Sequence, residues 1–378
     1  CIEDYEKGND VVVVLSAMGK TTDGLIAKAH EINPNPPKRE LDMLLVTGEQ
    51  VSVALMAMAM SSLGVPAVSL NAAQVVMHTS SAYGSAKLKR IDAERIRHEL
   101  ESRRIVIVTG FQGINKYDDF TTLGRGGSDT TAVALAAALH ADVCEIYTDV
   151  EGVYTADPRV VPNARKLAEV SYDEMLEFAS LGAKVLHNRS VEMAKKYGVK
   201  LVVLSSLTRA EGTIVKEETK VERTLISGVA ADASVARISV LGVENKPGIT
   251  FRVFNLLAKN HINVDIIIQS VTEPGKKDIS FTVAKTDLSD TMDLLREIRE
   301  SLTAREIVSE EGVAKLSVIG AGMCSNPGVA AKMFEALYSA DVNTEMIATS
   351  EIRITALIDE RDVKRAMRAV HDAFDLAD

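Results

Sequence analysis

The 378-residue sequence predicts an α/β domain with a largely parallel sheet, followed by two copies of a βαββαβ unit. Short β-branched runs alternate with helical patterns through the first half of the chain. The second half then repeats its own pattern, and a charged, polar stretch at residues 209–224 separates the halves. At roughly 150 residues per domain, a chain of this length suits two or three domains.

The β-branched runs of the first half are the expected strands of the sheet. They lie at 11–16, 66–70, 104–111, 143–150 and 199–206, and helical stretches connect them. This alternation is typical of a parallel sheet with helices on both faces, which we place at residues 1–222. The apolar stretch 51–70 contains Ser61, Gly64 and Pro66, so it predicts a buried helix leading into a strand and not a membrane span.

The second half contains an internal repeat. Residues 236–242 are similar to 314–320, and residues 262–264 are similar to 342–344. A Pro-Gly turn occurs at the equivalent positions 246–248 and 326–328. Each copy reads strand, Pro-Gly turn, helix, strand, strand, helix, which suits a ferredoxin-like unit. We place the two copies at 223–312 and 313–378.

The composition narrows the class of partner and the compartment. The net charge is −10 with acidic and basic residues interspersed, so neither nucleic acid nor a membrane surface is expected as a partner. Cys1, Cys144 and Cys324 are far apart and lack CxxC spacing, which argues against disulfides and zinc and favours a reducing cytosol. The first residues are acidic and polar, so we expect no signal peptide and a cytoplasmic protein.

A glycine-rich loop at 124–129 precedes an alanine-rich helix. Ser128 or Asp129 can cap that helix, while Gly126 and Gly127 let backbone N–H groups approach a ligand closely. A helix N-terminus attracts anions, and Arg125 adds a fork suited to a carboxylate or phosphate. The loop therefore predicts an anion site, with an ordinary glycine turn and helix cap as the alternative.

Polar residues also follow the first predicted strand. Ser16, Gly19 and Thr22 could line a cleft at the carboxyl ends of the strands, where open α/β sheets bind ligands. Helix capping by Thr21 or Thr22 alone is the alternative. Val14 stands where a P-loop requires glycine, so that motif is excluded.

Further candidates are less specific on local chemistry alone. Glu49 precedes a helix and could simply complement its dipole. Asp149 lies at the carboxyl end of a predicted strand, where open α/β sheets bind ligands, and the turn Asp157-Pro-Arg159 that follows adds a second basic side chain. The alternative is a plain turn-rich connection, since Asp-Pro is common in turns. Lys184 could be a solvated lysine, and we expect His187 to be structural because no nucleophile or metal-binding spacing accompanies it.

Together these segments resemble aspartokinase, in the amino-acid kinase family. The matching stretches are 16–25, 44–52, 110–116, 121–139, 143–167 and 182–187. The repeated unit resembles a pair of ACT domains, and 347–359 is similar to the form found in aspartokinases. The resemblance covers essentially the whole chain in the expected order.

The resemblance implies phosphorylation of the aspartate side-chain carboxylate by ATP and Mg²⁺, the entry step to lysine, threonine and methionine synthesis. In it, Glu49 would pair with the substrate ammonium, Arg125 with a carboxylate, and Asp129 would organise the transfer centre. The implied aspartate site comprises Ser16, Thr22, Glu49, Arg125, Gly126, Gly127 and Ser128. The implied nucleotide site comprises Thr148, Asp149, Tyr154, Thr155, Ala156, Asp157, Pro158, Arg159, Lys184 and Val185.

The resemblance also implies feedback control by lysine and/or threonine at the ACT domains. The implied effector contacts are Asn263, Val264, Asp265 and Gln269 in the first copy, and Asn343, Thr344 and Thr349 in the second. Each Pro-Gly turn opens a helix that could bind an amino-acid carboxylate, although the asparagines could merely tolerate turn geometry. ACT domains usually pair between chains, so a homodimer or larger assembly is expected.

Two departures from the family pattern and two alternative functions accompany this interpretation. The family's strand bearing Lys-Phe/Tyr-Gly-Gly, which holds ATP phosphates, would lie upstream of Cys1, and Asn188 replaces a usual proline. The alternatives are a regulatory subunit without activity and a kinase for another amino acid. Since a carboxylate is already ionised at neutral pH, no general base is needed, and we expect Asp129 to position a cation or a lysine.

Overall fold

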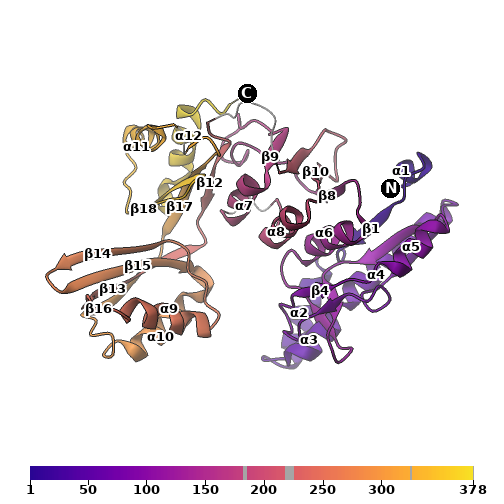
Figure 1. Ribbon diagram of the computed structural model, residues 1–378, viewed down its shortest axis with the longest axis horizontal. Coiled ribbons are helices and arrows are strands. Elements are labelled where there is room, and N and C mark those ends of the chain that lie inside the picture. The colour runs from indigo at the N-terminus through magenta and orange to yellow at the C-terminus, as the bar shows by residue number, and fades with distance from the viewer. Residues whose placement is uncertain (182–184, 218–224, 324–325, 378) are drawn as a thin grey trace. The chain divides into compact units, whose positions relative to one another are not determined.

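The computed structural model describes residues 1–181, 185–217, 225–323 and 326–377 (Figure 1). The chain forms two compact units. The first unit comprises Cys1–Val153, Ala168–Ala179 and Lys184–Thr219, and the second comprises Tyr154–Leu167, Ser180–Ala183 and Lys220–Asp378. The predicted boundary between residues 222 and 223 falls outside the described residues.

A three-stranded parallel sheet forms the core of the first unit. Its strand order is β1 (Val12–Leu15), β5 (Ile105–Thr109), β2 (Ala67–Leu70). The central strand β5 is buried on both faces, as its unbroken β-branched run predicts. Ile105 and Ile107 pack with Val53 of α4 (Thr47–Ser62). Val106 and Val108 share the other core cluster with residues of α5 (Glu94–Glu101) and α6 (Gly127–Leu139).

Two further sheets complete the first unit. One has the order β4 (Leu88–Arg90), β3 (His78–Thr79), β6 (Gln112–Ile114), β7 (Phe120–Thr122), and β7 leads into α6. The other has the order β8 (Cys144–Thr148), β10 (Leu201–Ser205), β11 (Thr213–Lys216), β9 (Glu169–Ser171). The remaining helices are α1 (Ile2–Glu6), α2 (Thr21–Ile32), α3 (Lys38–Leu45), α7 (Tyr172–Ser180) and α8 (Asn188–Tyr197). All five predicted strands of this domain are present, as β1, β2, β5, β8 and β10.

The helical stretch Lys38–Ser62 is long and apolar enough to pass a composition test for a membrane span. Within it, α4 buries Val53 and Met60 against β5, so the structure uses this stretch as a core helix. The predicted order of a helix followed by a strand is confirmed, because β2 follows α4, but the helix is buried on one face only, since Val51, Leu55 and Met58 are exposed.

The first copy of the repeat forms a complete ferredoxin-like unit in the second unit of the chain. Its elements are β13 (Val235–Glu244), α9 (Ile249–Lys259), β14 (Ile267–Glu273), β15 (Lys276–Ala284), η1 (Lys285–Asp287), α10 (Leu288–Ile298) and β16 (Glu306–Glu310). The sheet order is β14-β15-β13-β16, antiparallel throughout. Figure 1 shows α9 and α10 together on one face of this sheet.

The second copy obtains its fourth strand from elsewhere in the chain. Its own elements are β17 (Val313–Ile319), α11 (Val329–Ser339), β18 (Met346–Thr349), β19 (Arg353–Asp359), η3 (Glu360–Asp362) and α12 (Val363–Ala373). The fourth strand is β12 (Gly228–Asp232), which pairs with β17 in the order β12-β17-β19-β18. This corrects the boundary at 313, because a strand placed in the first copy completes the sheet of the second.

A segment of the predicted kinase domain also belongs to the second unit. Tyr154–Leu167 groups there with the ACT copies. Ala156, Val161 and Ala164 lie in the same core cluster as Leu316 of β17 and Val370 of α12. Residues 1–222 therefore do not form a single uninterrupted domain.

Candidate active site

The glycine-rich loop connects β7 to α6 with tight packing around its glycines. Gly126 has a φ of 64° and is the N-cap residue of α6. A Cβ atom at this position would lie 2.2 Å from the Cβ of His187, so only glycine fits. Among the described residues no side chain caps this helix, and the predicted capping by Ser128 or Asp129 is wrong. In the first turn of α6 the Gly127 N–H already donates to the Gly124 carbonyl at 3.0 Å, so the N–H groups of Ser128 and Asp129 are the donors that this turn offers to another acceptor.

Ser128, in the first turn of α6, meets the end of the first strand. The Ser16 hydroxyl donates to Ser128 Oγ at 2.7 Å, although 112 positions separate the two residues. Gly110 lies against this pair, since a Cβ there would be 2.6 Å from Ser128 Oγ. The structure thus brings together two predicted substrate residues at a helix N-terminus.

Glu49 lies buried in the first turn of α4, with 2% of its surface exposed. Its Oε1 accepts the Ala17 N–H at 3.2 Å, next in sequence to Ser16. No described residue donates to its Oε2. Burial raises the pKa of Glu49 to about 7, which its backbone hydrogen bonds only partly oppose. The carboxylate also accepts a hydrogen bond from the backbone of Glu49 itself in the first turn of α4, so a role at the helix N-terminus stays open beside a role in ligand binding.

Asp129 is half-buried one residue further along α6. Burial raises the pKa of its carboxyl, and a hydrogen bond from the backbone of His187 opposes that shift. The His187 ring also accepts the Arg189 N–H through Nδ1 at the start of α8. These contacts agree with the structural role predicted for His187.

Ser16 and Arg125 are the exposed members of the predicted aspartate site, and Thr22 is half-buried. Thr22 lies in the first turn of α2, while its neighbour Thr21 donates its hydroxyl to the Met18 carbonyl. The Arg125 guanidinium has no hydrogen bond or ion pair with the residues that the structure describes. Its fork is therefore available to an anion.

Two buried or braced polar residues near this loop were missed by sequence reasoning. Arg189 donates to the carbonyls of Leu123, at 2.5 Å, and Ala86, at 3.0 Å, and so holds the backbone that leads into the glycine loop. Asp42, 1% exposed, accepts the Gly84 N–H and both the N–H and the hydroxyl of Thr122. Asp42 gave no distinct signal in the sequence, because it lies in a stretch with other charged residues and α3 was not predicted as a separate element.

The residues predicted to bind the nucleotide are divided between the two units. Thr148 ends β8 and donates its hydroxyl to Asp149, while half-buried Val185 also belongs to the first unit. Lys184 lies outside the described residues. The residues Tyr154, Thr155, Ala156, Asp157, Pro158 and Arg159 all belong to the second unit.

Within that second group, side chains differ sharply in exposure. Thr155 and Ala156 are buried, at 0% and 4% exposure. Arg159 is 84% exposed at its side chain and forms a bidentate pair with Asp157, the closest approach being 2.8 Å. The structure therefore places Thr155 in the interior of the second unit, and Asp157 and Arg159 at its surface.

The predicted effector residues occupy equivalent positions in the two ACT copies. Asn263, Val264 and Asp265 lie between α9 and β14, and Asn343 and Thr344 lie between α11 and β18. Gln269 in β14 accepts the Thr250 hydroxyl at 3.0 Å, and Thr349 ends β18. The Asp265 carboxylate pairs with Lys315 at 2.7 Å, and Lys315, 4% exposed, also lies 3.3 Å from Asp232. An effector ammonium would therefore meet Asp265 in competition with Lys315.

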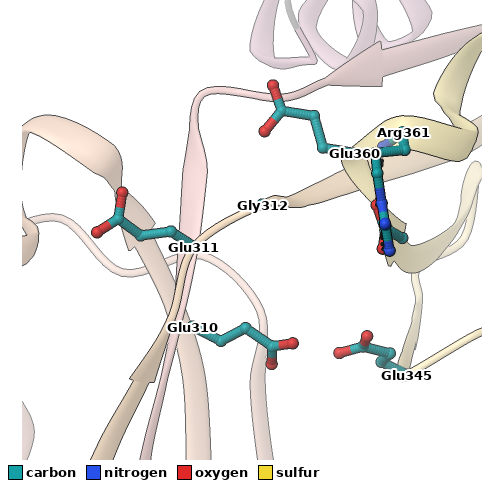
Figure 2. Close-up of a pocket in the computed structure, with 7 residues that line it drawn as sticks. Glu310, Glu311, Gly312, Glu345, Glu360 and Arg361 are labelled. Carbon is teal, nitrogen blue, oxygen red and sulfur yellow. Dashed lines mark hydrogen bonds and ion pairs between the residues drawn. The ribbon is translucent and has the colours of Figure 1, made fainter.

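A cavity of about 450 Å³ lies in the second unit, and none of the predicted site residues lines it, although its Glu345 directly follows Thr344 in sequence. It is lined by Glu310, Glu311, Gly312, Glu345, Asp359, Glu360 and Arg361 (Figure 2). Figure 2 shows the carboxylates of Glu310 and Glu345 pointing toward each other. Both pair with Arg237, Asp359 pairs with Arg361 and Glu360 pairs with Lys285, so four of the five lining carboxylates already have a cationic partner.

Comparisons with known proteins agree with the geometry. Residues 1–205 match the amino acid kinase family, and residues 236–302 and 316–374 each match an ACT domain. Aspartokinase of Bacillus sp. strain MGA3 is 51% identical over 377 residues, covering 100% of this chain and 92% of that protein. The chain belongs to the aspartokinase family. The aspartokinase of Corynebacterium glutamicum is 50% identical over 375 residues, covering 98% of this chain and 89% of its own length.

Solved structures of aspartokinases resemble this chain as well. Escherichia coli aspartokinase III in complex with aspartate and ADP superposes with a TM-score of 0.80 at 30% identity, covering 93% of this chain and 79% of that one. The same enzyme in complex with lysine and aspartate superposes with a TM-score of 0.72. Aspartokinases are phosphotransferases, and the ACT copies of this chain are those of an allosteric member of that family.

Proposed function

We propose that this protein transfers the γ-phosphoryl group of ATP to the side-chain carboxylate of L-aspartate, giving 4-phospho-L-aspartate. The observation that carries the proposal is the buried Glu49 carboxylate, whose Oε2 has no donor among the described residues. An orphaned, buried acceptor is costly unless a ligand supplies a donor. The α-ammonium of aspartate supplies one.

The surrounding groups suit the rest of an amino diacid. The Ser16 and Ser128 hydroxyls lie 2.7 Å apart at the uncapped N-terminus of α6. This terminus attracts one carboxylate, and the exposed guanidinium of Arg125 can bind a carboxylate in a bidentate manner. Thr22, Gly126 and Gly127 would complete the aspartate site, the two glycines through their backbone.

The chemistry requires alignment and neutralisation of charge. The attacking carboxylate is ionised at neutral pH, so no residue has to remove a proton from it. Asp129, half-buried in the first turn of α6, would hold a cation or a lysine beside the transferring group. No group of three or more His, Cys, Asp or Glu in the described part of the chain could hold a metal ion. Mg²⁺ in kinase sites binds mainly phosphate oxygens and water with one or two carboxylates, here Asp129 or Asp149, and would neutralise phosphate charge when bound.

The nucleotide would be bound by Thr148, Asp149, Lys184 and Val185 together with the segment Tyr154–Arg159. The aspartokinase III structure that resembles this chain contains ADP, which supports nucleotide binding here. Because the side chain of Thr155 is buried, we assign direct contact in this segment to the charged residues that reach the surface, half-buried Asp157 and exposed Arg159.

Feedback control would act through the ACT copies, in a cytoplasmic homodimer or larger assembly. Lysine is present in a related aspartokinase III structure, and threonine is the second candidate effector. Asn263, Val264, Asp265 and Gln269 in one copy, and Asn343, Thr344 and Thr349 in the other, would bind it. The reaction would begin the synthesis of lysine, threonine and methionine.

A coupled assay of ADP release tests this proposal against its alternatives. Aspartate, glutamate and N-acetylglutamate are offered separately to the full-length protein with ATP and Mg²⁺. We expect turnover with aspartate, inhibited by lysine or threonine. Turnover only with another acceptor would identify a different amino-acid kinase, and effector binding without any turnover would identify a regulatory subunit.

A further inference from the structure

Every polar group of Thr155 is used inside the second unit. Its N–H donates to the Arg165 carbonyl at 2.8 Å, and its carbonyl accepts the Val229 N–H at 2.7 Å. Its hydroxyl donates to the Leu376 carbonyl at 3.1 Å, accepts the Arg165 N–H at 2.9 Å, and lies 2.9 Å from His371 Nε2. The residue is fully buried, so it holds the segment in place from the inside.

His371 of α12 completes this network as a neutral imidazole. Because the Leu376 carbonyl can only accept, it takes the hydroxyl hydrogen of Thr155, and the contact with His371 is then satisfied when Nε2 carries the hydrogen and donates it. Burial lowers the pKa of His371, which Asp372 only partly offsets, in agreement with a neutral ring. Its Nδ1 is buried 3.8 Å from Asp372, beyond hydrogen-bond distance.

Further contacts tie the same segment to α12 and to the residues that follow it. The Arg368 guanidinium donates to the Val160 carbonyl at 2.8 Å, and Ala164 forms a β-bridge with Ala377. Ala156 and Val161 pack in one core cluster with Val370. The segment thus has a buried inner side, made by the second ACT copy, and an exposed outer side that carries Asp157 and Arg159.

We propose that Thr155 and His371 are positioning residues for nucleotide binding, through which α12 of the second ACT copy holds Asp157 and Arg159 in place. The inference rests on the proposed role of Tyr154–Arg159 in the nucleotide site. Neither positioning residue touches the nucleotide. Each acts by fixing the backbone that presents half-buried Asp157 and exposed Arg159, which come within three positions after the buried pair Thr155 and Ala156.

The inference predicts an effect on one substrate and not on the other. Thr155→Val keeps the shape of the side chain but leaves the Arg165 N–H, the Leu376 carbonyl and His371 Nε2 without their partner. We expect the KM for ATP to rise about tenfold, the equivalent of one lost hydrogen bond in the positioning network. The KM for aspartate should change less than about twofold. Thr155→Ser retains the hydroxyl, so its KM for ATP should lie close to that of the parent protein.

The experiment compares these variants with a matched control in the full-length protein. Thr355→Val removes a buried hydroxyl within the second ACT copy itself, the one bonded to Ser317 at 2.7 Å within the β17–β19 pair. It should lower the melting temperature without changing the KM for ATP. If Thr155→Val does not fold, His371→Leu and His371→Gln test the inference in its place. Glutamine retains a donor near the position of Nε2 and leucine does not, so only His371→Leu should raise the KM for ATP. Equal effects of Leu and Gln on the KM for ATP, or equal effects of Thr155→Val and Thr355→Val, would overturn the inference.

A separate arm tests the proposed nucleotide role itself. Asp157→Asn and Arg159→Ala remove the exposed charged pair without disturbing the buried side of the segment. If both leave the KM for ATP unchanged, the segment does not bind nucleotide and that part of the proposed function fails. If they raise it while Thr155→Val and His371→Leu do not, only the positioning inference fails.

Discussion

Replacing Glu49 with glutamine should weaken aspartate binding and, at the same time, change how stability depends on pH. Its carboxylate is 2% exposed, and burial raises its pKa from 4.5 to about 7. Below pH 4.5 the group is protonated in the folded and unfolded chains alike, so this shift has no effect on stability. Between pH 4.5 and about 7 the unfolded chain ionises first, and the folded state loses roughly 3 kcal/mol as the pH rises.

Glu49→Gln has no such titration, so the variant should gain stability over the parent protein by that amount between pH 4 and pH 8. For catalysis the sign is opposite. Loss of a hydrogen bond between the substrate ammonium and an ionised carboxylate costs ~1.5–3 kcal/mol, or roughly 10- to 150-fold in kcat/KM for aspartate. In the parent protein kcat/KM should rise with pH through about 7, as Glu49 ionises, and the variant should lack this rise.

The assays are urea unfolding across pH and coupled turnover with varied aspartate. Glu99→Gln is the matched control, since Glu99 is 3% exposed but burial is outweighed by hydrogen bonds from Arg95 and Arg104, which leave its pKa lowered. That control should destabilise the protein at neutral pH and leave the KM for aspartate unchanged. Parallel stability profiles for Glu49→Gln and the parent protein, together with an unchanged KM for aspartate, would refute the reasoning.

Three further substitutions test the rest of the site. Gly126→Ala should lower kcat and lower the free energy of unfolding by at least ~1–3 kcal/mol. The φ of 64° at this position and the 2.2 Å distance from an added Cβ to His187 leave no room for a side chain. An alanine variant as stable as the parent protein would contradict this. Arg189→Ala should raise the KM for aspartate roughly tenfold, because it removes the hydrogen bonds to the Leu123 and Ala86 carbonyls. Arg189→Lys should show nearly the same KM, since an ammonium lacks the planar fork of the guanidinium. A parental KM in the lysine variant would argue against a role in holding this backbone. Asp129→Asn should reduce kcat at least ~100-fold with the melting temperature largely preserved, and near-normal turnover would remove Asp129 from the transfer centre.

The sequence predicted the elements whose signal is local. Strand β5 has an unbroken β-branched run because both of its faces are buried, and each Pro-Gly turn marks a helix start in the repeat. The loop at 124–129 was found because glycine, arginine and a helix start are adjacent in sequence. Glu49 was found only by family resemblance, since local chemistry favoured a helix-dipole role.

Other features of the structure depend on contacts between residues far apart in the sequence. The periodicity of the sequence does not predict such contacts. Strand β12 reads as the start of the first ACT copy, yet the partner that satisfies its backbone is β17. The burial of Thr155 depends on His371, which is 216 positions away. Capping by Ser128 was a reasonable local expectation, but its hydroxyl bonds to Ser16 instead. In each case a tertiary hydrogen bond replaced the local one.

The pairing of β12 with β17 means that the first ACT copy is an insertion within the second. During synthesis β12 leaves the ribosome before its partner strand. Its edge stays unpaired until the whole inserted copy and then β17 have been synthesised. Such a contact between distant residues is slow to form and leaves an exposed strand edge in the meantime. A regulatory fragment designed for separate expression should therefore begin before Gly228, because one that begins at Val313 would lack an edge strand and be prone to aggregate.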